Sequence, residues 1–315
     1  MEDDNLFSIA FYNTENLFDY KDDKHTLDTD YTPSGRKKWG HYRYQHKINK
    51  IAKVISKIGT DNCMFPPVLV GLAEVETKQV AIDIIHSETL RYLNYDCVHY
   101  DSPDERGIDV ALLYHKDFFE LTSSEAIPVQ VFETNGVKDD TRDILYVQGN
   151  LYGELTHIFV NHWPSRRKGI DKTYLKRIAL ANILTYRMDS ILQNDPNAKI
   201  IIMGDFNDDP TSDSIAKHIV SDQIKNPMTS LLTPKQGSMV HNGVWHLFDQ
   251  ILYSSSYLTS DGNKFVSAKI YNKDFLTDWT GRNKGEPLRT YIGKFYRGGF
   301  SDHFPVYSLF QKSKC

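Results

Sequence analysis

Apolar residues along the chain fall into short runs separated by polar turns, and these runs predict the strands of a sheet. Four bulky apolar residues in succession at 200–203 are typical of a strand that is buried on both faces. The runs predict strands at residues 6–12, 68–73, 95–100, 109–114, 144–151, 158–160, 199–203, 248–253 and 304–310.

Apolar residues at helical spacing predict helices between several of these strands. The clearest stripe is formed by Ile48, Ile51, Ala52, Ile55 and Ile58. The pattern predicts helices at about 41–58, from Thr77 towards Leu93, from 173 to about 192, and at 213–220. Helices and strands without strict alternation favour an α/β (α+β) fold with a sheet core flanked by helices.

Two segments have too few regularly spaced apolar residues to predict an element. Residues 19–34 are rich in Asp, Lys and Thr and are predicted to be a mobile loop, whereas residues 271–299 are predicted to be a surface excursion. The sequence contains no repeat and no linker-like boundary, so we expect a single domain over residues 1–315.

Composition and charge narrow the classes of function. The chain is 40% apolar and 25% charged with a net charge of −4, which excludes a uniformly basic nucleic-acid-binding surface but not a local basic patch. Cys63, Cys97 and Cys315 form no metal-binding or disulfide pattern, and no apolar stretch is long enough to span a bilayer. We expect a monomer, cytoplasmic if the N-terminus is native and exported if a signal peptide was removed.

Polar residues are concentrated where the predicted strands end or begin. Asn13, Glu74, His162 and the pair Asp205/Asn207 follow apolar runs, whereas Asp249 and the pair Asp302-His303 precede them. In a sheet with antiparallel neighbours, the ends of some strands and the starts of others share one edge. Each residue alone has a simpler explanation, and Gly204-Asp205-Phe206-Asn207 is as easily a turn as a site. Their joint placement favours one polar rim.

The residue types at this predicted rim favour hydrolysis of a phosphate ester. Asp, Glu and Asn oxygens suit Mg²⁺ or Mn²⁺, and the lack of clustered Cys or His disfavours zinc. A hard divalent ion with two histidines and a spare carboxylate can neutralise phosphoryl charge and activate water. The sequence has no GxGxxG, phosphate-binding P-loop, GxSxG or HExxH motif for other common chemistries.

A series of short motifs carries a family resemblance. In chain order they are Tyr12-Asn13-x-x-Asn16-Leu17-Phe18, Gly71-Leu72-Ala73-Glu74-Val75, Arg106-Gly107-Ile108-Asp109-Val110-Ala111, Asn161-His162-Trp163-Pro164-Ser165, Gly204-Asp205-Phe206-Asn207, Phe248-Asp249-Gln250-Ile251 and Ser301-Asp302-His303-Phe304-Pro305. In this order they resemble the endonuclease/exonuclease/phosphatase superfamily, the fold of pancreatic deoxyribonuclease, over about residues 6–310. The resemblance implies a four-layer α/β/β/α sandwich, in which two packed, mainly antiparallel sheets are flanked by helices.

The resemblance also implies roles for single residues at the metal and the phosphate. Glu74 is similar to the main metal carboxylate of the family, with Asn13 and Asp302 near the ion, which would be Mg²⁺ or Mn²⁺. His303 resembles the histidine that contacts the scissile phosphate, and Asp249 resembles the carboxylate that orients and charges it.

Further residues resemble the groups that act on water, the leaving oxygen and the phosphate. Asp205 is similar to the residue proposed to activate water, with Asn207 as its amide partner. His162 resembles an acid at the leaving oxygen, with Asp109 as its carboxylate partner. Arg142 and Asn161 are the expected substrate-phosphate contacts. The tyrosine that apurinic endonucleases place near the phosphate has no clear counterpart after Tyr114, which disfavours an abasic-site activity.

The sequence therefore predicts a metal-dependent phosphodiesterase, and the first hypothesis is a nuclease acting on DNA or RNA, as an endonuclease or an exonuclease. Residues 35–44 interleave cations with aromatic rings, and residues 165–168 add a second basic cluster, although both also suit a solvated loop. The alternative is a phosphatase or phospholipase C-type hydrolase acting on inositol phosphates, sphingomyelin or another small phosphate ester. A non-catalytic binding module is disfavoured because every expected catalytic position holds a competent residue.

Overall fold

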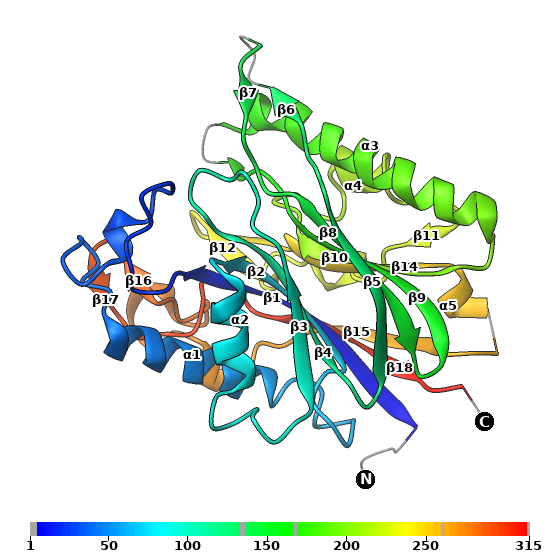
Figure 1. The fold of residues 1–315 in the computed structure, drawn as a ribbon, viewed down its shortest axis with the longest axis horizontal. Coiled ribbons are helices and arrows are strands. Elements are labelled where there is room, and N and C mark those ends of the chain that lie inside the picture. Colours follow the sequence, from blue (N-terminus) through cyan, green and yellow to red (C-terminus); the bar gives the residue numbers. More distant parts are fainter. Residues whose placement is uncertain (1–4, 133–135, 167–168, 260, 314–315) are drawn as a thin grey trace.

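Two six-stranded sheets lie face to face between layers of helix in the computed structural model, which describes residues 5–132, 136–166, 169–259 and 261–313 (Figure 1). The first sheet has the order β15 (Lys264–Ile270), β18 (Val306–Gln311), β1 (Leu6–Leu17), β2 (Leu69–Val75), β4 (Asp109–His115), β3 (Tyr95–His99). The second has the order β11 (Ile224–Lys225), β14 (Asp249–Ser254), β10 (Lys199–Asp205), β9 (Glu154–His162), β8 (Ile144–Leu151), β5 (Phe119–Ile127).

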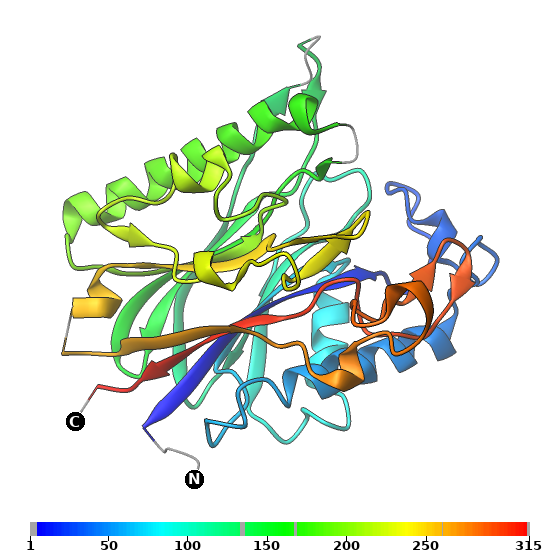
Figure 2. The same ribbon diagram turned by 180° about the vertical axis from the view of Figure 1, so that it is seen from behind.

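Helices cover the outer face of each sheet, which confirms the predicted four layers. The first sheet carries α1 (His41–Ile55) and α2 (Lys78–Ile85), and the second carries the long α3 (Ile170–Asn194) (Figures 1 and 2). The predicted stripe of α1 is fully buried, and the Thr77 side chain accepts the Val80 N–H at the start of α2.

Short elements complete the connections. They are α4 (Asp213–Ala216), α5 (Ser256–Thr259), the 3-10 helices η1 (Thr29–Tyr31), η3 (Thr229–Leu231), η4 (Asp274–Leu276) and η5 (Gly281–Asn283), and the paired strands β6 (Val131–Phe132) with β7 (Lys138–Asp139), β12 (Met239–His241) with β13 (Val244–His246), and β16 (Tyr291–Ile292) with β17 (Phe295–Tyr296).

Each large sheet contains one parallel pair among antiparallel neighbours. The parallel pairs are β1 with β2 and β9 with β10. Parallel neighbours end at the same edge, and the antiparallel neighbours β18 and β14 begin there. The topology therefore brings the ends of four strands and the starts of two to one rim.

The two sheets approach each other closely beneath this rim. A Cβ atom on Gly71 of β2 would lie 2.4 Å from the Met203 sulfur of β10, so only glycine fits without movement of that side chain. A Cβ atom on Gly204 would lie 2.5 Å from the Asn161 carbonyl oxygen of the neighbouring strand β9. The absence of a side chain at Gly71 lets the two layers approach closely, and its absence at Gly204 leaves room for the Asn161 backbone.

Several boundaries differ from the sequence predictions. β1 continues through Asn13 to Leu17, and α2 and α4 end earlier than their patterns indicated. The strands β5 and β15 were not predicted, because both lie at sheet edges and alternate poorly between apolar and polar residues. Segment 19–34 contains η1 and buries Asp28.

The described part of the chain contains no helix that is both long and apolar enough to cross a membrane. Of the three cysteines, Cys63 and Cys97 are buried and form no disulfide within the described residues, and Cys315 lies outside them.

Candidate active site

Asp205 lies at the centre of the polar rim. Its strand position is paired with His162 on one side and Asp249 on the other. Asp205 Oδ2 lies 3.8 Å from His162 Nε2 and 4.0 Å from His303 Nε2, and it accepts a hydrogen bond from Asn13 Nδ2 at 2.9 Å. The structure thus brings these predicted site residues from both sheets around one carboxylate.

The environment of Asp205 favours a proton acceptor that works near neutral pH. Burial and then the neighbouring Asp249 carboxylate raise the pKa of Asp205 to about 7, and His303 partly opposes them. The backbone N–H of Asn207 donates to Asp205 Oδ1 at 3.0 Å and fixes the carboxylate. A carboxylate with this pKa can take a proton from water and release it again at physiological pH.

His303 and Asp249 form a buried ion pair. His303 Nδ1 donates to Asp249 Oδ2 at 2.6 Å, and Asp249 itself is fully buried. Burial opposes a charge on the imidazole, but Asp249, Asp205 and Asp302 outweigh it and raise the pKa of His303 well above its usual value. These neighbours favour a protonated imidazole, and the His303 Nε2 atom lies 4.0 Å from Asp205 Oδ2 at the rim.

Glu74 reaches the rim through a bulge in β2. The pairing register of β2 shifts between Ala73 and Val75 with both neighbouring strands. Glu74 has a φ of +63°, which residues other than glycine seldom adopt. Its Oε1 lies 3.8 Å from His162 Nε2, and its Oε2 accepts the Asn16 N–H at 2.6 Å. This bulge turns a carboxylate from a buried strand towards Asp205 in the other sheet.

Ion pairs and hydrogen bonds fix the turn that follows β10. Asn207 has a φ of +50° and its side chain donates to the Trp163 carbonyl at 2.9 Å. Asp208 accepts from Arg166 at 2.7 Å and lies 2.8 Å from Arg177 Nε. Arg166 also donates to the Asn207 carbonyl at 2.8 Å, so this network fixes the strained residue beside Asp205.

Asp302 lies at the open side of the rim, paired with Arg289 at 3.1 Å and 3.9 Å from His303 Nε2. On the opposite side, Arg106 lies 3.8 Å from Glu74 Oε1. Sequence reasoning missed both arginines as site residues. Arg106 is the first residue of the motif that leads into β4, which offered a signal, whereas Arg289 lies in the irregular excursion.

Arg142 and Asp109 lie beside the rim, and Arg142 shares Asp104 with Arg106. Arg142 is buried, lies 3.4 Å from Asp104 and donates to the Ile108 carbonyl. Asp109 accepts from the backbone N–H and the hydroxyl of Ser102, and burial raises its pKa to about 6. The described contacts of Asp109 thus run to the Ser102 turn.

Asn161 is not brought to the rim. Successive residues of a strand point to opposite faces, so Asn161 faces away from the side on which His162 meets Asp205. Its amide nitrogen donates to the Met203 carbonyl, its oxygen accepts from Trp163 Nε1, and its side chain is fully buried. In this structure Asn161 supports the sheet and does not offer its amide to a phosphate.

The rim residues fit a divalent cation. The carboxylates of Glu74, Asp205, Asp249 and Asp302 gather at one edge, and the Asp249 carboxylate adds to burial in raising the pKa of Asp205. Asn13 Oδ1 accepts the Glu15 N–H and retains a second lone pair. Glu74, Asn13 and Asp302 are residues that could hold the ion. Ligand atoms of Asp205, Asp249 and His303 also lie within 4.8 Å of one another, and His303 donates to Asp249 within this group.

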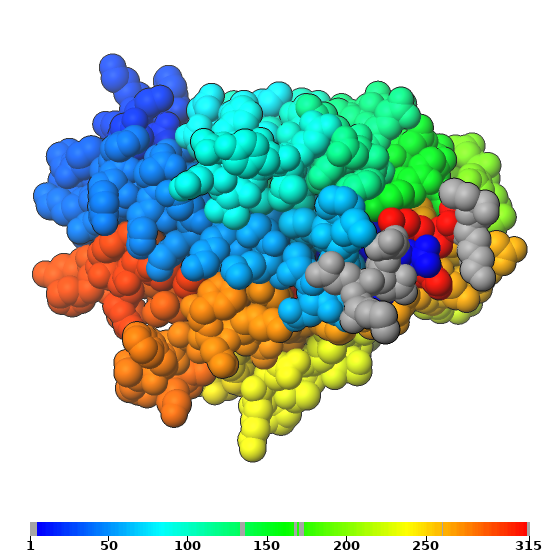
Figure 3. All heavy atoms as spheres, turned by 90° about the horizontal axis from the view of Figure 1, so that it is seen from below, coloured from blue at the N-terminus to red at the C-terminus, as the bar shows by residue number. Residues whose placement is uncertain are grey.

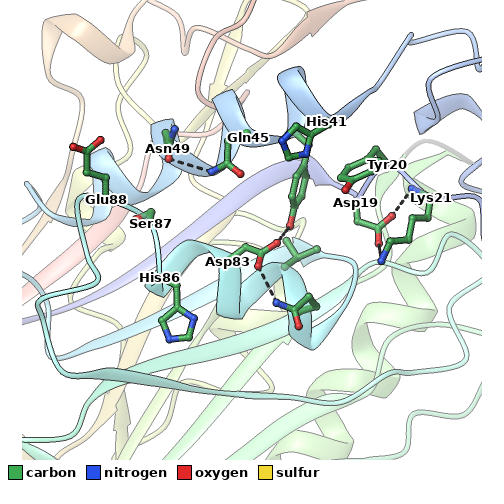
Figure 4. A pocket seen from close by; sticks show the side chains of 13 residues that line it. Asp19, Tyr20, Lys21, His41, Gln45, Asn49, Asp83, His86, Ser87 and Glu88 are labelled. Carbon is green, nitrogen blue, oxygen red and sulfur yellow. Dashed lines mark hydrogen bonds and ion pairs between the residues drawn. The ribbon is translucent and has the colours of Figure 1, made fainter.

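A separate cavity lies on the outer side of the first sheet. It has a volume of about 390 Å³ and lies between α1, α2 and the segment that follows β1 (Figure 4). Asp83 is its best-fixed group, because Tyr44 and Gln79 both donate to the carboxylate. Among the described residues, those of the rim do not line this cavity.

Comparisons with known proteins agree with this geometry. The family model described as "Endonuclease/Exonuclease/phosphatase family" matches residues 8–312. Comparison with curated proteins gave no match.

Solved structures that share the fold include a humanized TDP2 of D. rerio, at 14% identity and a TM-score of 0.60, covering 98% of this chain and 100% of the other. The human Nocturnin catalytic domain is similar at 16% identity and a TM-score of 0.58, over 99% and 96%. A mannosyl-6-phosphatase of Bacteroides thetaiotaomicron is similar at 16% identity and a TM-score of 0.56, over 96% and 99%.

Proposed function

This chain belongs to the endonuclease/exonuclease/phosphatase family, and from that premise we propose that it is a divalent-metal-dependent phosphodiesterase that cleaves nucleic acid. It is a phosphoric ester hydrolase by family. The observation that carries the proposed mechanism is the approach of two histidines to one buried carboxylate, His162 at 3.8 Å and His303 at 4.0 Å from Asp205. That arrangement supports attack by water on a phosphate held between them.

In this proposal each rim residue has one task. Asp205 accepts the proton of the attacking water, and Asn207 holds Asp205 in place through its backbone N–H. His303, kept protonated by Asp249, donates from Nε2 to a non-bridging phosphoryl oxygen and stabilises the charge that develops there. His162 is placed to protonate the leaving oxygen. A divalent ion bound at Glu74 would neutralise further phosphoryl charge.

Cations on both sides of the rim favour a polyanionic substrate. Arg106 lies beside Glu74 on one side, and Arg289 lies beside Asp302 on the other. A phosphodiester chain that passes through the site would meet a positive side chain before and after the scissile group. Arg167 and Lys168 of the second basic cluster lie outside the described residues.

Hydrolysis of a substrate panel tests the proposal. With Mg²⁺ or Mn²⁺ we expect cleavage of plasmid or single-stranded DNA, or of RNA, and the length distribution of the products would distinguish endonuclease from exonuclease activity. Hydrolysis confined to inositol phosphates, sphingomyelin or sugar phosphates would contradict the nucleic-acid substrate and leave the phosphoesterase chemistry in place.

A small phosphate ester is the second candidate substrate. The fold is shared with a protein whose name states that it is a mannosyl-6-phosphatase, and the same rim chemistry would serve a monoester. Release of inorganic phosphate from mannose 6-phosphate, at a rate higher than that of nucleic-acid cleavage, would favour this candidate.

Replacing Asp249 with asparagine is expected to move the alkaline limb of the pH–rate profile to lower pH. The Asp249 carboxylate is the main group that raises the pKa of His303, and without it only Asp205 and Asp302 oppose the effect of burial, so the pKa falls. His303 then loses its proton at a lower pH, and the loss of activity is larger at pH 8 than at pH 6. The measurement is kcat/KM against pH for both proteins.

A profile that keeps its shape and only falls in height would show that the charge of His303 is not required. Asparagine is nearly isosteric with aspartate, so the packing around the fully buried Asp249 is preserved in this comparison.

A further inference from the structure

The excursion, residues 271–299, carries positive charge on a chain that is negative overall. Between Asp278 and Arg297 the cations are Arg282, Lys284, Arg289, Lys294 and Arg297, and the acids are Asp278 and Glu286, whereas the whole chain has a net charge of −4. Arg297 is paired with Asp278 and Arg289 with Asp302. Among the described residues, Arg282, Lys284 and Lys294 enter no ion pair and are exposed.

Two large aromatic rings of the excursion also face solvent. Trp279 is 77% exposed and Phe295 is 68% exposed, and the Lys294 ammonium lies 5.7 Å from the centre of the Phe295 ring. Leaving such rings in water forfeits the favourable free energy of burying them. Single exposed rings are common on proteins, so their meaning here depends on whether they are fixed and where they lie.

Both rings stand on a fixed backbone. Phe295 belongs to β17, which pairs with β16 in a hairpin. Trp279 follows Asp278, whose N–H donates to the Glu286 carbonyl at 2.8 Å and whose carboxylate accepts from Arg297 at 3.0 Å. The contact between Asp278 and Arg297 joins the Trp279 loop to the end of the hairpin. The rings are therefore presented by one preorganised unit.

This unit is attached to segment 35–55 and to the rim. Lys37 Nζ lies 4.5 Å from the centre of the Tyr291 ring, and the Arg43 guanidinium lies 4.5 Å from the centre of the Tyr296 ring. These two cations of segment 35–44 therefore make cation–π contacts with the hairpin. Figure 3 shows the excursion, orange to red-orange, beside this blue segment. Arg289, which precedes the hairpin, is paired with Asp302 of the rim, so the excursion contacts the site at this residue.

We propose that the excursion binds single-stranded nucleic acid next to the active site, with unpaired bases stacked on Trp279 and Phe295 and phosphates on Arg282, Lys284 and Lys294. The proposal rests on the proposed nuclease function and adds the strand type and the residues that hold it. Rings interleaved with cations match the alternation of bases and phosphates, and bases offer their faces only when they are unpaired. A membrane is less well matched, because the tip of the hairpin is Gly293-Lys294 and not an apolar wedge.

Fluorescence anisotropy of labelled oligothymidylate, in EDTA so that no cleavage occurs, tests the proposal. The double variant W279A/F295A is expected to bind more weakly by about fivefold or more for each ring, with an unchanged salt dependence. The double variant R282A/K284A is expected to lower the slope of log K against log salt by about 1.4, because each phosphate contact contributes about 0.7 for a single strand.

Controls separate binding from folding and from catalysis. Tyr92→Ala removes a ring that is 81% exposed and lies 4.7 Å from Arg91 but is outside the excursion, and it should bind and cleave like the unaltered protein. Melting temperatures of the excursion variants should stay within about 2 °C, since exposed substitutions change stability little.

Unchanged affinity in W279A/F295A would overturn the inference even if the protein cleaves DNA. Binding of the oligonucleotide that depends on both rings would support it even if only small esters are hydrolysed, in which case the proposed function alone fails. Preference for duplex DNA, or binding to phosphatidylserine vesicles without binding to the oligonucleotide, would also overturn it.

Discussion

Replacing Asp205 with asparagine is expected to lower turnover by about 10²–10⁴-fold, the usual contribution of a positioned general base. The amide has almost the same shape, but it cannot accept the proton of the attacking water. It also places an N–H₂ group where Asp205 now receives donors from Asn13 and Asn207. The measurement is kcat at saturating Mg²⁺ on the best substrate of the panel.

Stability against pH shows whether this variant is folded. The pKa of Asp205 is raised to about 7 in the folded protein, so the folded state holds a proton that the unfolded chain has already lost above about pH 4. Folding stability in EDTA therefore falls as the pH rises towards 7, and Asp205→Asn removes this fall. We expect the variant to melt at a higher temperature than the unaltered protein at pH 8. The difference between the two melting temperatures should be smaller at pH 5. Near-normal turnover in a folded variant would remove Asp205 from the mechanism.

Removing the divalent ion with EDTA is expected to abolish hydrolysis, and added Mg²⁺ or Mn²⁺ should restore it. In the same assay, Glu74→Gln should raise the metal concentration for half-maximal rate by about 100-fold or more. Even the loss of a residue that only hydrogen-bonds to a metal ligand lowers metal affinity or activity by about 10–100-fold. Glu74 is expected to be decisive because its φ of +63°, within the bulge of β2, directs its carboxylate towards the rim.

Glu88→Gln is the matched control for the metal titration. Glu88 is an exposed carboxylate on the turn after α2, and its loss should leave the metal dependence unchanged. Full activity in EDTA would disprove the role of a metal, and equal metal dependence in Glu74→Gln would move the ion to other carboxylates of the rim.

The strands of the core were predictable because burial on both faces leaves a simple pattern. Strands β8 and β10 begin where their apolar runs begin, and all residues of β10 are buried. Strand β5 was missed because it is an edge strand whose middle residues face solvent, so its sequence contains Thr, Ser and Glu in place of apolar residues. Edge strands are defined by their neighbours more than by their own composition.

Most of the polar rim was predictable because strand ends are visible in the sequence. The positions of Asp205, Glu74 and His303 followed from the apolar runs beside them. The sequence could not show that Asn161 faces into the sheet, because this depends on the phase of alternation along β9. Arg289 could not be found either, since its contact with Asp302 depends on how an irregular segment folds back.

The contact of Gly71 with Met203 gives the spacing of the two sheets a mechanical role. Glu74 follows Gly71 by three residues, and Asp205 follows Met203 by two, so the proposed metal carboxylate and the proposed proton acceptor lie on opposite sides of one packed seam. A rigid-body separation of the layers, with every hydrogen bond inside each sheet intact, would pull these groups apart. Under the proposed mechanism such a motion would stop hydrolysis without unfolding either sheet, so we expect heating to reduce activity before the protein melts.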